Sequence, residues 1–167
     1  MRPIEGRAWL FGDDISTDLM APGLYFKASM EVMARHCLET ADPHFAAGVR
    51  PGDVIVAGCN FGMGSAREQA AMALKHLGVG AVVALSFGRI FHRNALNFGL
   101  PALVLKSPLA ISAGDPLRVN PRTGHIENRR SGEVTTTTPI PPHLLDMVAA
   151  GGLMPWLKIR LEKERSR

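Results

Sequence analysis

Hydrophobic positions along the chain fall into short runs separated by turn residues, a pattern typical of alternating strands and helices. The run at residues 53–58 (DVIVAG) is almost unbroken, as expected for a strand covered on both faces. A second such run, AVVAL, occupies residues 81–85, and the segment 65–77 between them has the spacing of a helix. Strand, helix and strand in this order predict a parallel βαβ unit.

Further elements on either side of this unit complete one predicted domain. Strands are expected at 7–11, 102–105, 117–120 and 133–137, and helices at 30–40, 86–97 and 142–150. The last two strands are short and flank a Pro-Arg-Thr-Gly turn, which favours antiparallel pairing. We therefore predict an α/β fold in which residues 1–167 form a single domain, with a mixed, partly parallel sheet flanked by helices.

Composition and charge exclude several classes of protein. Hydrophobic residues make up 46% and charged residues 20% of the 167 positions, which is ordinary for a globular domain and argues against disorder. The basic tail at 158–167 holds five basic and two acidic residues, +3 of the total +4, which leaves +1 for the rest. Residues 1–157 therefore offer no basic face with interleaved aromatic rings of the kind that binds nucleic acids, and we expect no nucleic-acid partner. The tail is interpreted as a solvated helix end, with docking to an acidic partner left open.

The cysteines and the apolar runs bear on metal binding and location. Cys37 and Cys59 are too few for a disulfide framework, and one fewer than the three thiolates that would hold a cubane iron–sulfur cluster with one open iron. The histidines show no metal-ligand spacing. No run approaches the roughly 18 to 20 apolar residues that span a bilayer, and the first residues lack an apolar signal core. We expect a cytoplasmic protein that binds neither metal nor membrane.

The segment at residues 60–68 (NFGMGSARE), here named the glycine loop, follows a predicted buried strand and precedes a predicted helix. Anions bind at such positions, because glycines allow close approach and the first helical N–H groups are unpaired. The loop lacks the features of a Walker loop, a dinucleotide fingerprint or a nucleophile elbow. No Asp or Glu occurs between residues 69 and 114, so its cations favour a carboxylate ligand, which Arg67 could bind bidentately.

Structural interpretations of the same residues stay open. Ser65 and Glu68 have the spacing of a capping box, in which both side chains only satisfy helix N–H groups. Arg67 could equally form a surface salt bridge. Residues 12–22, here named the acidic loop, lack the ligand spacing of a calcium site, so capping of a neighbouring loop is favoured over metal binding.

Four segments together resemble the small subunits of the isopropylmalate isomerase group, which are swivel domains of the aconitase superfamily. They are FGDDISTDLMAPGLYF (11–26), PGDVIVAGCNFGMGSARE (51–68), ALSFGRIFHRNALNFGLPAL (84–103) and, more weakly, AGGLMPWLK (150–158). They follow the family's order and cover most of the chain. The resemblance implies a swivelling β/β/α domain that binds no cofactor itself and closes over a large subunit carrying a 4Fe-4S cluster.

The resemblance also implies roles for individual residues. Ser65 is similar to the serine that removes and returns a proton on carbon, and Arg67 to the arginine that binds a substrate carboxylate. Asp18 matches the aspartate of an Asp-x-x-Thr-Asp loop and is expected to orient active-site groups. Further contacts to a small dicarboxylate substrate are expected from Gly62, Gly64, Ala66, Tyr25, Phe26 and Lys27.

The resemblance implies a hydro-lyase that isomerises isopropylmalate by dehydration and rehydration, as in leucine biosynthesis. Three positions depart from the usual family loop: Met63 replaces a cysteine, Ala66 a serine and Gln69 a histidine. Phe26 also alters the segment that contacts the variable substituent. A sister substrate, dimethylmalate or homoaconitate, therefore stays open. The other class of function is a non-catalytic anion-binding or regulatory module.

Overall fold

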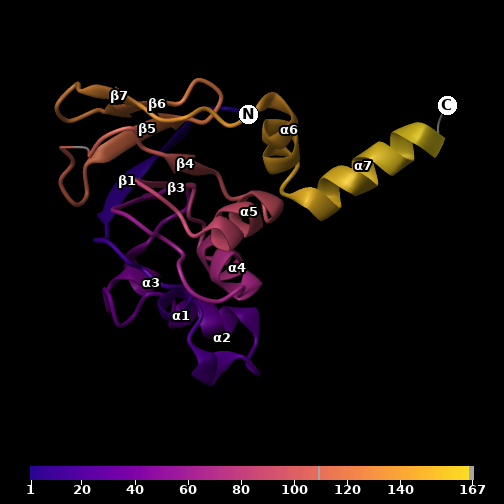
Figure 1. Ribbon diagram of the computed structural model, residues 1–167, viewed down its shortest axis with the longest axis horizontal. Helices are drawn as coiled ribbons and strands as arrows, with labels where there is room; N and C mark the ends of the chain where they lie inside the picture. The colour runs from indigo at the N-terminus through magenta and orange to yellow at the C-terminus, as the bar shows by residue number, and fades with distance from the viewer. Residues whose placement is uncertain (109, 166–167) are drawn as a thin grey trace.

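The computed structural model describes residues 1–108 and 110–165, which form one seven-stranded sheet flanked by helices (Figure 1). The strand order is β4-β3-β2-β1-β5-β6-β7. The parallel strands are β1 (Ile4–Leu10), β2 (Val54–Ala57), β3 (Ala81–Ala84) and β4 (Ala102–Val104). The antiparallel strands are β5 (Pro116–Asn120), β6 (His125–Asn128) and β7 (Val134–Thr136). The predicted mixed, partly parallel sheet is confirmed.

The helical elements are α1 (Thr17–Met20), the 3₁₀ turn η1 (Gly23–Tyr25), α2 (Met30–Arg35), α3 (Phe45–Gly48), α4 (Glu68–His76), α5 (Arg89–Asn97), α6 (Pro142–Ala149) and α7 (Leu153–Arg165). The predicted helices are present with different ends, whereas α1, η1, α3 and the strand β6 are not predicted by the sequence. The helix predicted at 30–40 ends at Arg35, because the chain turns and Leu38 adopts a φ of 61° that no α-helix contains. The helix predicted from residue 65 begins only at Glu68, after Gly64 with a φ of 98°.

Apolar side chains cover both faces of the sheet. Successive residues of β2 point to opposite faces, so Ile55 joins the core beneath α1 to α5, whereas Val54 and Val56 join the core that contains Leu145 of α6. Strand β3 alternates in the same way. The unbroken apolar runs in the sequence are therefore explained by two separate cores on one pair of strands.

The two edges of the sheet approach each other beyond β4 and β7. Leu105 and Thr137 form an isolated antiparallel bridge, and the Thr138 N–H donates to the Val104 carbonyl at 3.0 Å. These contacts curl the sheet and shield part of both edges, which otherwise expose unpaired backbone groups.

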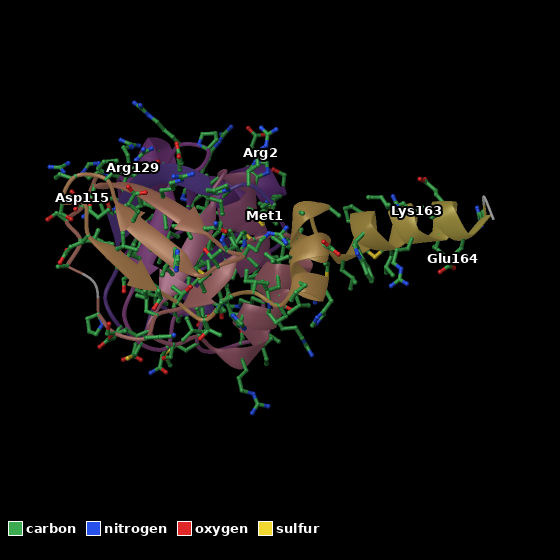
Figure 2. All side chains as sticks on the ribbon, turned by 90° about the horizontal axis from the view of Figure 1, so that it is seen from above. Met1, Arg2, Asp115, Arg129, Lys163 and Glu164 are labelled. Atoms are coloured by element: carbon green, nitrogen blue, oxygen red, sulfur yellow. The ribbon has the colours of Figure 1, made fainter. Side chains whose placement is uncertain are left out.

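Helix α7 projects away from the rest of the protein (Figures 1 and 2). None of its residues is buried, although the half-buried Trp156 ring packs on the core. The Arg160 guanidinium lies over this ring, with its Cζ 4.9 Å from the ring centroid. In Figure 2 the side chains of Lys163 and Glu164 point away from the body. The tail is thus an exposed helix up to residue 165, and residues 166 and 167 lie outside the described part. Among the described residues, no helix combines the length and hydropathy needed to cross a membrane.

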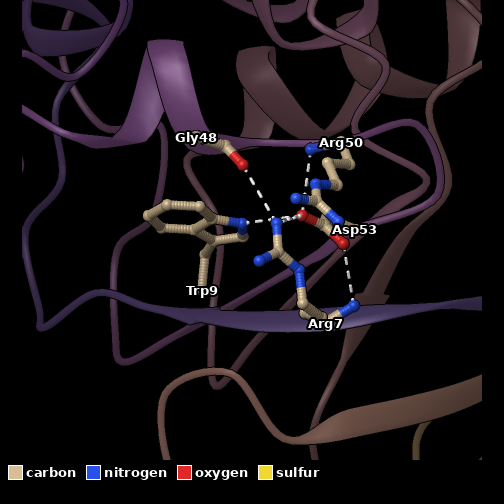
Figure 3. A network of polar contacts seen from close by, with 5 residues as sticks. All are labelled: Arg7, Trp9, Gly48, Arg50 and Asp53. Atoms are coloured by element: carbon tan, nitrogen blue, oxygen red, sulfur yellow. Dashed lines mark hydrogen bonds and ion pairs between the residues drawn. The ribbon is translucent and has the colours of Figure 1, made fainter.

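A buried carboxylate joins β1 to the start of β2 (Figure 3). Asp53, 3% exposed, accepts hydrogen bonds from the Arg7 backbone N–H at 2.8 Å and from Arg7 Nη2, Trp9 Nε1 and the Arg50 N–H, each at 3.0 Å. Burial alone would raise the pKa of Asp53, but these hydrogen bonds outweigh it and hold the pKa below its ordinary value. The charged carboxylate therefore stabilises the fold.

We expect Asp53→Asn to lower the free energy of unfolding by about 2 to 3 kcal/mol at pH 7, because the carboxylate accepts hydrogen bonds as a charged group. Since its folded-state pKa lies below the unfolded value of about 3.9, this stabilisation is present above that pH and is lost as the pH falls through the folded-state pKa. In urea unfolding, the difference from wild type should therefore narrow below about pH 4.

The matched control is Asp146→Asn on the exposed surface of α6, which removes the same charge. Its free energy of unfolding should stay within about 0.5 kcal/mol of wild type. An equal loss in both variants would contradict a specific role for the buried carboxylate.

Candidate active site

The acidic loop and the glycine loop lie side by side at the carboxyl ends of the parallel strands β1 and β2. The Gly62 N–H donates to the Ile15 carbonyl at 2.7 Å, and the Thr17 N–H donates to the Met63 carbonyl at 2.9 Å. Ser16 and Met63 form a parallel bridge between the same loops. Ligands of open α/β sheets bind at this end of the strands.

Acidic side chains fasten the acidic loop to the start of the glycine loop. Asp13 Oδ1 accepts the Cys59 N–H at 2.6 Å, and Asn60 Nδ2 donates to Asp14 Oδ1 at 2.8 Å. Asp14 and Asn60 both adopt left-handed backbone angles, with φ of 57° and 60°. Aspartate and asparagine tolerate this conformation better than other non-glycine residues. The interpretation of the acidic loop as a cap for its neighbour is confirmed for these two carboxylates.

Gly62 is required by the close approach of α5. Its φ is 78°, and a Cβ at this position would lie 2.2 Å from Cγ of Phe91. Gly88, which precedes α5, approaches from the other direction, and its own Cβ would lie 2.4 Å from the Gly62 carbonyl oxygen. Because the Gly62 N–H already donates to Ile15, Gly62 shapes the loop and offers no free donor to a ligand.

Ser65 is exposed and does not form the capping box that its spacing with Glu68 permits. Helix α4 begins at Glu68, its N-cap is Arg67, and no side chain caps it. The Ser65 hydroxyl instead lies 3.3 Å from Thr17 Oγ1. The capping-box interpretation is therefore wrong, because residues 64–67 are not helical and Arg67, not Ser65, is the N-cap residue of α4.

Unpaired backbone donors lie on the segment that carries the Ser65 hydroxyl. Within the described chain, the N–H groups of residues 64–67 donate to no acceptor, and α4 adds the unpaired donors of its first turn. Gly64 reaches this arrangement with a φ of 98°, which glycine adopts without strain. Donors grouped in this way can stabilise an oxyanion.

Arg67 is held beside this loop by three contacts. Its side chain, 23% exposed, forms an ion pair with Asp18, donates to the Ala21 carbonyl at 3.3 Å and lies over the Phe26 ring at 4.6 Å. The salt bridge left open by the sequence is thus present. It joins two residues expected in the site, and it shows the guanidinium holding a carboxylate.

The other residues expected to contact substrate lie on the same side of the protein as Arg67, but they differ in exposure and in the side chains they contact. Tyr25 is half-buried and stacks on His36 at 3.9 Å between ring centroids. Phe26 and Lys27 are exposed, as is Ala66 next to Ser65. Sequence reasoning missed Thr17, which is buried against Ser65; its place before Asp18 in the Asp-x-x-Thr-Asp loop was the only available signal.

Among the described residues, no ligand set for an iron–sulfur cluster is present. In the described part of the chain, no group of three or more His, Cys, Asp or Glu side chains could hold a metal ion. Cys37 is buried, and burial raises the pKa of its thiol; Cys59 is exposed. A surface cavity of about 240 Å³ lies elsewhere, against Ile126 and Val134, and none of the predicted site residues lines it. Residues 63–66 are exposed, so this part of the glycine loop forms an open face.

Comparison with known proteins identifies the class. The model of the aconitase C-terminal domain matches residues 22–108, and this chain belongs to that family. It is 50% identical over 155 residues to 3-isopropylmalate dehydratase small subunit 2 of Archaeoglobus fulgidus, covering 92% of this chain and 93% of that protein. It is 46% identical over 152 residues to the methanogen homoaconitase small subunit of Methanothermobacter thermautotrophicus, covering 90% and 88%. A crystal structure of 3-isopropylmalate dehydratase from Methanocaldococcus jannaschii is 39% identical, with a TM-score of 0.91 over 99% of each chain.

We expect Gly62→Ala to destabilise the protein by about 2 to 4 kcal/mol, because it combines left-handed strain with a clash against Phe91. The control is Gly114→Ala: its φ of 80° is similar, but its Cβ would meet nothing within 4 Å. That variant should lose only about 1 to 2 kcal/mol. Urea unfolding of both variants measures the difference, and equal losses would show that close packing of α5 against the loop is unimportant.

Proposed function

We propose that this chain is the small subunit of a heteromeric hydro-lyase that isomerises isopropylmalate by dehydration and rehydration in leucine biosynthesis. The observation that carries the proposal is the exposed Ser65 hydroxyl, set among unpaired N–H groups and beside Arg67. The names of the most similar relatives support the same activity. Fold alone would not, since one fold can host many reactions.

Ser65 acts as the base of the proposed reaction. In the dehydration direction, Ser65 Oγ forms a bond to the proton on the carbon next to the hydroxyl-bearing carbon, and the C–H electron pair becomes part of the new double bond as the hydroxyl departs. In rehydration Ser65 returns the proton to the carbon that had carried the hydroxyl, and the hydroxyl adds to the other carbon, which completes the isomerisation. A serine hydroxyl is a weak acid, so its alkoxide needs the N–H groups of residues 64–67 and the positive charge of Arg67 for stabilisation.

Arg67 binds one substrate carboxylate. Its guanidinium presents parallel N–H donors that match a carboxylate, and the Phe26 ring below holds its plane. In the structure the Asp18 carboxylate pairs with this side chain, and Asp18 is 65% exposed. A substrate carboxylate can therefore share or take this position, while Asp18 keeps the guanidinium oriented between turnovers.

We propose that the site is completed by a large subunit that carries the iron–sulfur cluster. The described residues of this chain offer no ligand set for it, and a metal of the partner would supply Lewis-acid assistance to departure of the hydroxyl. Exposed apolar side chains on the segments around Ser65 fit a face that a partner covers: Leu24, Phe26, Met63 and Ile90. Closure of the partner over this face would exclude the water that otherwise quenches an alkoxide.

The proposal is tested by assembling the chain with its large subunit under anaerobic conditions and following formation of the unsaturated diacid by ultraviolet absorbance. Isopropylmalate should be converted faster than dimethylmalate or homocitrate. Preference for homocitrate would instead place the chain with its homoaconitase relative. Binding of dicarboxylates with no turnover of any of them would support a non-catalytic module and contradict the proposal.

We expect Ser65→Ala to lower kcat by about 10³-fold in that assembly, because general-base assistance is lost while substrate contacts remain. Ser131→Ala is the matched control, since its hydroxyl only accepts the Glu133 N–H in the turn before β7. Wild-type activity in Ser65→Ala would show that another group removes the proton.

We expect Arg67→Lys to raise KM by about 10- to 100-fold, the effect of losing one charge-assisted hydrogen bond, because an ammonium group cannot contact both carboxylate oxygens in one plane. The control Arg118→Lys makes the same substitution on the exposed surface of β5, where Arg118 only pairs with Glu5. It should leave KM unchanged. Steady-state kinetics in the assembled enzyme give both values. An unchanged KM in Arg67→Lys would exclude a bidentate contact.

A further inference from the structure

We propose that Thr17 is a positioning residue whose hydroxyl orients the Ser65 side chain and donates a hydrogen bond to it when Ser65 is deprotonated. This inference rests on the proposed role of Ser65 as the base. It adds a residue of the acidic loop, 48 positions away in the sequence, to the machinery that makes a serine hydroxyl basic.

The geometry places the Thr17 hydroxyl between two oxygens of Ser65. Thr17 Oγ1 lies 3.2 Å from the Ser65 carbonyl oxygen and 3.3 Å from Ser65 Oγ. Thr17 is 1% exposed, so water does not compete for these contacts. No other side chain in the described part of the chain hydrogen-bonds to Ser65 Oγ.

The count of protons assigns a direction to each contact. A threonine hydroxyl carries one hydrogen and two lone pairs. The Ser65 carbonyl can only accept, so in the resting enzyme Thr17 donates to that carbonyl and accepts the hydrogen of the Ser65 hydroxyl. This arrangement aims the Ser65 hydrogen at Thr17 and leaves lone pairs of Ser65 Oγ directed elsewhere, toward the exposed side.

Deprotonation of Ser65 reverses the second contact. The Thr17 O–H bond then turns from the carbonyl to the Ser65 alkoxide, which becomes the stronger acceptor. The Ser65 proton passes to solvent water, since Ser65 is exposed, and the turn of the Thr17 hydroxyl itself breaks no covalent bond. No heavy atom has to move, because the two oxygens lie at nearly equal distances from Thr17 Oγ1. When Ser65 takes the substrate proton, the Thr17 hydroxyl turns back and again donates to the Ser65 carbonyl.

The backbone holds Thr17 in place for this exchange. Its N–H donates to the Met63 carbonyl at 2.9 Å, and the adjacent Ser16 is bridged to Met63. The charged and titratable residues on the surrounding elements are Asp13, Asp14 and Asp18 on the acidic loop and α1, Arg67, Glu68, Lys75 and His76 on the Ser65 segment and α4, and Arg89, His92 and Arg93 on α5. Because Asp18 and Arg67 are paired with each other, neither side chain replaces the hydrogen bond that the Thr17 hydroxyl donates to Ser65 Oγ.

The test compares Thr17→Val, which keeps the shape and removes the hydroxyl, with Thr17→Ser, which keeps the hydroxyl, in the enzyme assembled with its large subunit. We expect Thr17→Val to lower kcat by about 10²-fold, as for loss of one oxyanion donor, with KM within about twofold of wild type. The pH at which activity is half-maximal should rise by about two units, because each unit of pKa corresponds to a tenfold change. Thr17→Ser should restore both values.

The control is Thr137→Val. Thr137 is also 1% exposed, and its hydroxyl donates to the Gly124 carbonyl at 3.0 Å in the antiparallel part of the sheet. This variant removes a buried hydroxyl with a similar partner and should leave kcat and the pH profile unchanged. If Thr17→Val does not fold, Thr17→Cys replaces it, because a thiol has a similar size and is a weak donor.

Failure of this inference differs from failure of the proposed function. If Ser65→Ala is inactive while Thr17→Val or Thr17→Cys keeps the wild-type kcat and pH profile, Thr17 has no role and the base assignment stands. If Ser65→Ala is active, the base assignment is lost, and the role of Thr17 is lost with it. A kcat loss in Thr17→Val that does not recover at high pH, or that Thr17→Ser shares, indicates a structural role and also overturns the inference.

Discussion

Backbone pairing between the acidic loop and the glycine loop is the interaction on which the rest of the site depends. The Ile15–Gly62 and Thr17–Met63 hydrogen bonds join loops that follow neighbouring parallel strands. The buried Asp53 network joins the same two strands at their other end. Since β1 and β2 are thereby held at both ends, the side chains that follow them have little freedom to separate.

This constraint explains how a small domain can hold the proposed base, Ser65, in a fixed and exposed position. The loop carries unpaired backbone N–H groups on both sides of Ser65 along the chain, and three contacts hold the Arg67 side chain in place. Preorganised donors of this kind stabilise charge at little reorganisation cost, but only where bulk water is excluded. An open face with exposed apolar side chains is therefore consistent with a domain that acts only when a partner closes over it.

The departures from the usual family loop leave this framework intact. Met63 contributes its backbone to the pairing with the acidic loop, so replacement of a cysteine there does not disturb the bridge. Ala66 removes a hydroxyl next to Ser65 but keeps the N–H that the extended loop exposes. Phe26, by contrast, lies with its ring under the guanidinium of Arg67, the residue expected to bind substrate.

The sequence by itself determined the covered parallel strands, the helices between them and the location of the glycine loop, because the unbroken run in Val54–Ala57 and the loop glycines are local signals. It missed β6, α1, η1 and α3, which are three or four residues long and carry no clear periodic pattern. It left the role of Ser65 undecided, since a capping box and a catalytic loop share the same spacing. Only the tertiary structure paired Arg67 with Asp18 and buried Thr17 against Ser65. These contacts join positions more than 45 residues apart, and their geometry comes from strand pairing and from the left-handed turns at Asn60, Gly62 and Gly64, which spacing along one segment does not specify.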